Sequence, residues 1–235
     1  MMSLAEILDA LEAFHGPQQP TWPADPYLFL VWWHCGYPAS DVACAKGWAS
    51  LHAGIGVDPK DILASPASKL TAVLKPGGMF PEVRAQRLKQ VAERVQTKFA
   101  GDLTRTLRSM PLSKARAELK KFPNVADPGA DRILLFGGLT PIAAVPSNTA
   151  QVIVRIRRGQ ERQNYSRNYR EGQEIIDAES SESFAARSRA YLLIKKHGEQ
   201  ICKRTNPKCD VCPVAASCTF FSLRPFLCGA RRSLS

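Results

Sequence analysis

The sequence predicts an all-α protein, and three observations support this fold class. Apolar residues recur at helical spacing along almost the whole chain, so that successive segments each form one hydrophobic face. Gly, Pro, Ser or Asp stands at nearly every point where one helix would end and the next begin. Strand-like sequence is scarce, because VIVRIR at 152–157 is the one β-branched run and it also fits a buried helix.

The first helix is predicted to begin after Ser3, whose hydroxyl can cap it, and to end before Gly16 and Pro17. The segment PQQPTWPADP at 17–26 is then expected to form an extended linker. The remaining helices are expected at about 27–35, 40–53, 59–64, 67–74, 82–99, 102–109, 113–121, 128–137, 148–158, 165–179 and 183–201.

The composition indicates a globular protein with a basic surface. A chain of 235 residues that is 45% hydrophobic can form one large or two small domains, each with its own core. Lys and Arg outnumber Asp and Glu by 32 to 21, which gives a net charge of +11 and a pI near 9.5. This balance favours a polyanionic partner such as nucleic acid, although charge alone is weak support.

The first residues, MMSLAEILDALEAFHG, are amphipathic and contain Asp and Glu where a signal peptide would be basic and then apolar. The longest apolar run, YLFLVWWHC at 27–35, is about half the length that crosses a bilayer. We therefore expect an intracellular protein, cytoplasmic or nucleoid-associated, that is neither secreted nor inserted in a membrane.

Four of the seven cysteines lie close together in CKRTNPKCDVCPVAASC. Six, two and five residues separate these four, which are Cys202, Cys209, Cys212 and Cys218. Four thiolates at this spacing can surround one metal centre. Zinc and unligated thiols are the alternatives, but zinc ribbons usually contain two close cysteine pairs and only one is present. Cys35, Cys44 and Cys228 are expected to be small buried or tail thiols.

The cysteine spacing resembles the 4Fe-4S loop of the helix-hairpin-helix DNA glycosylases, in the branch of endonuclease III and adenine glycosylase. AYLLIKKHGEQIC at 190–202 resembles the helix that enters this loop, with His197 in a structural role. GGMFPEVRAQRLKQVAERV at 77–95 and DVACAKGWASLHAG at 41–54 resemble further family segments. The resemblance implies a mainly structural 4Fe-4S cluster, a monomer, and double-stranded DNA, damaged or mismatched, as the partner.

The resemblance also implies two helical domains. A six-helix bundle with the helix-hairpin-helix motif is expected at 26–142, with its hairpin at about 122–137. The iron-sulfur cluster domain is expected to combine 1–25 with 143–220, and 221–235 to form a C-terminal tail. In this family, bent DNA lies across both domains and a flipped nucleotide enters between them.

FPNVA at 122–126 aligns with the Leu-Pro-Gly-Val-Gly turn of the family, whose amides bind a DNA phosphate. The corresponding residues are Asn124, Val125 and Ala126. Asn tolerates a left-handed backbone, whereas Ala126 is expected to lose about 1 kcal/mol or more in it. Asp127 is expected to cap the next helix, with Pro128 as its first residue. Because Asp127 places a negative charge near the phosphate, the contact is expected either to be weaker than in the family or to depend on Lys120 and Arg132.

The two residues that usually carry the chemistry of the family are replaced. Bifunctional members have a lysine that forms a Schiff base, and the aligned position is Pro128. Nearly all members have an aspartate where this chain has Pro146. The weak substitutes are Asp127, Asp131 and Asn148, and each has a structural alternative: a helix cap, a first-turn charge and, with Ser147, another cap.

Other residues are candidates for DNA contact. Tyr37, in HCGYPASD, suits stacking in the gap that a flipped nucleotide leaves, but it is equally well an ordinary loop tyrosine. Lys203, Arg204 and Lys208 in the cysteine loop suit phosphates, or are simply solvated. The Arg-rich and Tyr-rich segment at 155–170 has the same two interpretations.

Three functions remain open from the sequence. The first is a DNA glycosylase-like protein of the base-excision-repair type that binds damaged or bent duplex DNA, with non-standard or monofunctional hydrolysis of the N-glycosidic bond. The second is a non-catalytic protein that binds DNA lesions or DNA structures. The third is an iron-sulfur redox sensor, which leaves the hairpin and the net charge unexplained. Pro128 and Pro146 argue against Schiff-base lyase chemistry.

Overall fold

The computed structural model describes residues 2–223, and its described part consists of helices and connecting turns without a strand. This confirms the all-α class. The ambiguous run VIVRIR lies within α10 (Gln151–Arg158), so its β-branched residues form a buried helix. Cys228 and residues 224–235 of the expected tail lie outside the described residues.

The helices agree with the predicted ranges to within about two residues at most ends. From the linker onward they are α2 (Pro26–His34), α3 (Asp41–Gly54), α4 (Pro59–Ala64), α5 (Ala67–Leu74), α6 (Pro81–Phe99), α7 (Leu103–Arg108), α8 (Leu112–Leu119) and α9 (Asp127–Phe136). Before the linker lies α1 (Leu4–His15), and α10 is followed by α11 (Tyr165–Glu179) and α12 (Phe184–Gln200). No helix among residues 2–223 combines the length and apolarity needed to cross a membrane.

Polar caps explain where several helices begin. Ser3 and Glu6 form a capping box at α1, with the Ser3 Oγ accepting from the Glu6 amide at 3.3 Å and Glu6 Oε2 accepting from the Ser3 amide at 2.7 Å. At α2, Asp25 Oδ1 accepts from the amides of Tyr27 and Leu28 at 2.9 and 3.0 Å. Proline at the first position of α2 needs no such partner.

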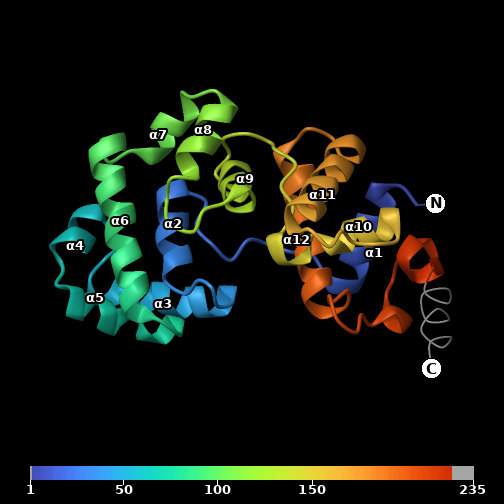
Figure 1. The fold of residues 1–235 in the computed structure, drawn as a ribbon, viewed down its shortest axis with the longest axis horizontal. Helices are drawn as coiled ribbons and strands as arrows, with labels where there is room; N and C mark the ends of the chain where they lie inside the picture. The colour runs from blue at the N-terminus through green and yellow to red at the C-terminus, as the bar shows by residue number, and fades with distance from the viewer. Residues whose placement is uncertain (1, 224–235) are drawn as a thin grey trace. The chain divides into compact units, whose positions relative to one another are not determined.

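The chain forms two compact units (Figure 1). One spans Pro20–Thr140, and the other combines the chain up to Gln19 with the chain from Pro141 onward. The expected roles of 26–142 as a helix-hairpin-helix domain and of 1–25 with 143–220 as an iron-sulfur cluster domain stay predictions.

The unit at Pro20–Thr140 is built around α6, on which α2, α4 and α5 pack. The linker contributes Trp22, which is 7% exposed and lies edge-on to Phe136 with ring centroids 5.0 Å apart. Arg132 of α9 stacks over Trp22, with the guanidinium carbon 3.7 Å from the ring centroid. The linker is therefore anchored in this unit by an aromatic side chain.

In the second unit, α1 from the start of the chain packs on α12 from near its end, and α10 packs on α11 and α12 (Figure 1). The short turn Ser147–Thr149 also packs on α12. Gly198 permits this approach, because a Cβ there would overlap the side chain of Thr149. This close contact explains the glycine that follows His197.

Candidate functional site

The hairpin between α8 and α9 has one left-handed residue, Asn124, with φ of 57°. When the Asn124 side-chain amide is oriented so that its oxygen faces a donor, that oxygen accepts from Arg87 Nη1 of α6 at 2.6 Å. Ala126 has φ of −104° and ψ of −175°, which is extended. The expected left-handed strain at Ala126 is therefore wrong, because the turn needs only one residue with positive φ.

The start of α9 also differs from the prediction. Ala126 is the N-cap residue, Asp127 is the first helical residue and Pro128 the second, and no side chain caps the helix. Asp127 does not cap because its carboxylate turns to α8, where Oδ1 lies 2.7 Å from Lys120 Nζ. The first turn of α9 thus points its backbone amides outward without a side-chain acceptor.

Asp131 is fully buried and lies beyond the first turn of α9, so it is not the first-turn charge that was expected. Arg116 of α8 binds both of its oxygens, with Nε 2.6 Å from Oδ1 and Nη2 2.8 Å from Oδ2. This two-point ion pair joins the two helices of the hairpin motif. Both acids near the hairpin are therefore engaged in ion pairs.

Helix α2 packs against the hairpin turn and the start of α9. The ring of His34 is buried, with Nε2 3.0 Å from the Pro123 carbonyl and Nδ1 2.7 Å from the Leu30 carbonyl. Burial lowers the pKa of His34. Gly129 lets α9 approach Trp33, since a Cβ at Gly129 would lie 3.0 Å from the Trp33 ring. The turn is thus held from α2 and from α6.

Two exposed turns in the same unit are joined by Arg84, whose side chain is 1% exposed. Its Nε donates to the Met79 carbonyl at 3.0 Å and its Nη2 to the Gly78 carbonyl at 2.6 Å, while its Nη1 donates to the Cys35 carbonyl. The turn at 77–80 is consequently bound to the turn at 35–39.

These joined turns expose three large side chains: Tyr37 is 36% exposed, Met79 68% and Phe80 60%. The ring of Tyr37 packs on Trp33, and Phe80 has φ of 58°, a left-handed conformation that a bulky residue rarely adopts. Tyr37 was a candidate from the sequence, whereas Met79 and Phe80 were not. The available signal was two large apolar residues after Gly77-Gly78, in a turn and not on a helix face.

The four clustered cysteines line one shared pocket in the second unit. Its other walls are mainly apolar and include Ile156, Ile201, Val214 and Phe220. Burial raises the pKa of Cys202, Cys218 and Cys212, the last to about 11, so their thiolates require a nearby positive charge. Among residues 2–223, no three His, Cys, Asp or Glu side chains form a site for a single metal ion.

Arg155 of α10 organises the loop that contains Cys202. Its guanidinium is 4% exposed and donates to the carbonyls of Lys203 and Arg204, both at 2.8 Å. Nη1 also lies 3.8 Å from Cys202 Sγ, and Nη2 donates to Glu161 at 2.6 Å. The side chains of Lys203, Arg204 and Lys208 are exposed. Arg155 thus holds the backbone of Lys203 and Arg204, and Arg204 Nε lies 3.6 Å from Glu161 Oε2.

Two histidines lie next to the pocket. His197 is 1% exposed, and its Nε2 lies 3.5 Å from Cys212 Sγ. Its Nδ1 lies 3.0 Å from His15 Nε2 at the end of α1. Burial, and to a lesser extent the charge of His15, lowers the pKa of His197 to about 4. His197 is thus buried between the cysteine loop and the end of α1, and its expected structural role stays a prediction.

The remaining predicted residues have simpler environments. Pro146 is buried, Asn148 is exposed, and neither the turn at Ser147–Thr149 nor α10 has a side-chain cap, so the capping alternative for Ser147 and Asn148 is wrong. The Arg132 side chain is 11% exposed and lies 3.7 Å from Asp41, so its guanidinium is used within the fold.

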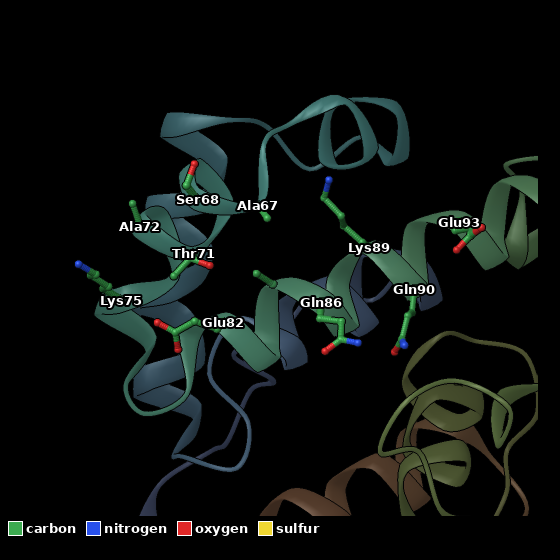
Figure 2. Close-up of a pocket in the computed structure, with 11 residues that line it drawn as sticks. Ala67, Ser68, Thr71, Ala72, Lys75, Glu82, Gln86, Lys89, Gln90 and Glu93 are labelled. Atoms are coloured by element: carbon green, nitrogen blue, oxygen red, sulfur yellow. The ribbon is translucent and has the colours of Figure 1, made fainter.

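A separate open groove lies between α5 and α6 (Figure 2). Ser68 and Thr71 of α5 line it together with Gln86 and Lys89 of α6. Its walls carry both Lys and Glu, and none of the predicted DNA-binding residues is among them. The groove therefore does not add to the candidate site.

The arrangement of helices is similar to that of solved DNA glycosylases. No protein-family model and no curated protein sequence matches the chain. A structure of endonuclease III in a non-covalent complex with DNA is similar at a TM-score of 0.72 and 19% identity, over 96% of this chain and 100% of that chain.

Two further structures show the same likeness. A thermostable thymine-DNA glycosylase matches at a TM-score of 0.70 and 19% identity, over 93% of this chain and 94% of that chain. The 3-methyladenine DNA glycosylase MagIII of H. pylori, bound to 1,N6-ethenoadenine, matches at a TM-score of 0.58 and 20% identity, over 84% of this chain and 95% of that chain. The chain therefore has the fold of the helix-hairpin-helix DNA glycosylases.

Proposed function

We propose that this protein binds damaged or bent duplex DNA in a process of the base-excision-repair type. The observation that carries the proposal is the pair of turns that Arg84 joins, with Tyr37, Met79 and Phe80 exposed on them. Large apolar side chains on a firmly held turn can enter a base step and unstack it. The net charge of +11 and the fold shared with DNA-bound endonuclease III support the same function.

The hairpin is proposed as the phosphate contact. A helix N-terminus attracts anions through its unpaired amides and its dipole, and α9 has no side-chain cap to occupy them. The Val125 amide donates to the Phe122 carbonyl at 3.2 Å, so we assign the contact to the backbone of Asn124 and Ala126 and not to Val125. Lys120, paired with Asp127, offsets the negative charge of that carboxylate beside the phosphate.

We further propose that Cys202, Cys209, Cys212 and Cys218 hold a 4Fe-4S cluster. Four thiols around one shared, mainly apolar pocket are the donor set that a 4Fe-4S cluster requires. The cluster, when bound, supplies the positive charge that the buried thiolates require and closes the loop. The exposed Lys203, Arg204 and Lys208 would then face DNA phosphates.

We infer that lesion binding without base excision is the activity that this site supports best. Asp131 is buried in an ion pair with Arg116, and Asp127 is paired with Lys120, so neither acid is placed to activate water. Pro128 and Pro146 have no functional group that could replace the amine and the carboxylate of the family. Monofunctional hydrolysis with Asp127, which is about half exposed, is the catalytic alternative.

The proposal is tested with duplexes that carry uracil, oxidised, alkylated or mismatched bases. Binding is measured over a range of salt, and excision is measured in single turnover with alkali cleavage and borohydride trapping. We expect tighter binding to at least one modified duplex and no excision. Phe80→Ser is expected to reduce that affinity about tenfold, while Phe184→Ser, a change of another exposed phenylalanine, leaves it unchanged.

The alternatives give different results. Equal affinity for modified and intact duplexes would contradict lesion recognition. Release of a base without a trapped intermediate would establish monofunctional hydrolysis in place of simple binding. A borohydride-trapped complex would show that an amine elsewhere in the chain performs lyase chemistry.

A further inference from the structure

The contacts of His197 connect the cysteine pocket to the end of α1. Its Nε2 lies 3.5 Å from Cys212 Sγ, and its Nδ1 lies 3.0 Å from His15 Nε2. We propose that His15 positions His197 to donate a hydrogen bond to the Cys212 sulfur, and that this bond stabilises the reduced form of the metal cluster. The inference rests on the proposed 4Fe-4S cluster and adds a redox role for these two side chains.

The direction of the hydrogen bonds follows from what each atom can do. A cysteine sulfur that binds iron is a thiolate, has no S–H, and can only accept a hydrogen bond. A neutral imidazole carries one N–H, so His197 must place it on Nε2 to donate to Cys212. Nδ1 is then an acceptor, and its partner, His15 Nε2, must be the donor. His15 thereby selects the tautomer of His197.

The surroundings favour this arrangement. His197 is 1% exposed and lines the pocket together with apolar residues such as Ile201 and Val214, so water does not compete for its ring. The rings of His15 and His197 meet at 72° with centroids 5.3 Å apart, an edge-on contact that fits a nitrogen-to-nitrogen hydrogen bond.

A hydrogen bond to a cluster sulfur has a known electrostatic consequence. Reduction adds negative charge to the cluster and its thiolates, so an N–H directed at a thiolate stabilises the reduced form more than the oxidised form and raises the reduction potential. Without a donor at position 15, His197 is released to the other tautomer, and the lone pair of Nε2 would then face the sulfur. The potential is therefore expected to fall.

The first measurement uses the wild-type protein purified without oxygen. Iron and sulfide content establish whether the cluster is present. Resonance Raman spectra of wild type and His197→Phe in H2O and D2O then report the Fe–S(Cys) vibrations, which shift on exchange if an N–H donates to a cysteine sulfur. Because Arg155 also donates to the Cys202 sulfur, the part of the shift that His197→Phe loses is the part assigned to His197. This readout does not depend on DNA binding.

The second measurement compares the reduction potentials of four variants by voltammetry. His15→Leu removes the donor, and we expect its reduction equilibrium to change by about tenfold, or 59 mV for one electron, towards the oxidised form. His15→Gln keeps an N–H donor and is expected to stay close to wild type. His197→Phe removes the bond to sulfur and is expected to shift further than His15→Leu. His52→Leu changes an exposed histidine of α3 and is the control.

The outcomes separate this inference from the cofactor proposal. Protein without iron and sulfide would overturn the cluster and this inference together. A normal cluster whose Fe–S(Cys) bands do not shift in D2O would overturn the hydrogen bond alone. Equal potentials for wild type and His15→Leu at equal iron content would show that His15 has no positioning role. A shift in His15→Leu that His15→Gln reverses would support it.

Discussion

Arg116 binds both carboxylate oxygens of the fully buried Asp131, at 2.6 and 2.8 Å. This ion pair connects α8 with α9, the two helices of the hairpin motif. Arg116 also approaches Asp127 at 3.9 Å, so one arginine serves two acids of α9. A carboxylate held in this way is a structural group, and the hairpin keeps its shape through an ion pair.

We expect Asp131→Asn to lower the free energy of unfolding by about 2 kcal/mol, because a buried carboxylate loses its two charged hydrogen bonds while Arg116, whose side chain is 32% exposed, stays partly solvated. Urea denaturation measures this effect. Asp127→Asn is the matched control, and since its pairs are half exposed, it should cost less than about 1 kcal/mol. Similar losses in the two variants would contradict a structural role specific to Asp131.

Ala126→Ser is expected to have opposite effects on stability and on DNA binding. A serine at the N-cap can accept from the first-turn amides of α9 and should stabilise the protein by about 1 kcal/mol. The same hydroxyl competes with a phosphate for those amides, so affinity for duplex DNA should fall about fivefold. Thermal unfolding and fluorescence anisotropy measure the two effects, with Ala53→Ser on the exposed side of α3 as control. Unchanged affinity would remove the hairpin amides from the proposed interface.

Arg84→Met is expected to cost about 3 kcal/mol of stability, since three carbonyls lose a charged donor. Lys should not rescue it, because an ammonium cannot reproduce the planar fork that reaches all three oxygens. Limited proteolysis should then cut the released turns at 35–39 and 77–80 faster than in wild type. Persisting protection of both turns in Arg84→Met would show that other contacts join them.

Alanine at Lys203, Arg204 or Lys208 is expected to weaken binding equally on intact and modified duplexes. Each lost phosphate contact should reduce the slope of log K against log salt by about 0.9. Lys46→Ala, which changes an exposed lysine of α3, should leave the slope unchanged. A slope unaffected by all three loop substitutions would indicate that these cations remain solvated in the complex.

Cys209→Ser is expected to abolish iron binding, while Cys44→Ser, a buried thiol outside the pocket, should retain it. Iron per chain measures the difference. Loss of the cluster should also destabilise the unit that contains α10 to α12, because the bonds to four cysteines that would close the loop at 202–218 are lost. Full iron content in Cys209→Ser would exclude this cysteine as a ligand.

The sequence predicted most helix boundaries because the ends carry local signals. Ser3, Asp25 and Asn164 cap helices through their side chains, and Pro26 and Pro81 occupy first positions. Asn124 could be assigned a positive φ for the same reason, since its backbone preference is local.

Contacts between distant segments could not be predicted in this way. Arg84 belongs to a basic helix by sequence, and only the fold brings its guanidinium to the carbonyl of Cys35. Asp131 was assigned to the first turn, but its burial depends on where α8 places Arg116. The link between His15 and His197 joins residues 182 positions apart. None of these partners has a signature at a fixed sequence spacing.

The pairing of α1 with α12 constrains the order in which the chain can fold during synthesis. The unit at Pro20–Thr140 is continuous and can complete its core as soon as it has left the ribosome. The apolar face of α1 precedes that unit in the chain and has to wait until α12 has been translated, so Leu4, Ile7, Leu8 and Leu11 remain exposed in the meantime. The unit at Pro20–Thr140 can thus be complete before α1 packs on α12.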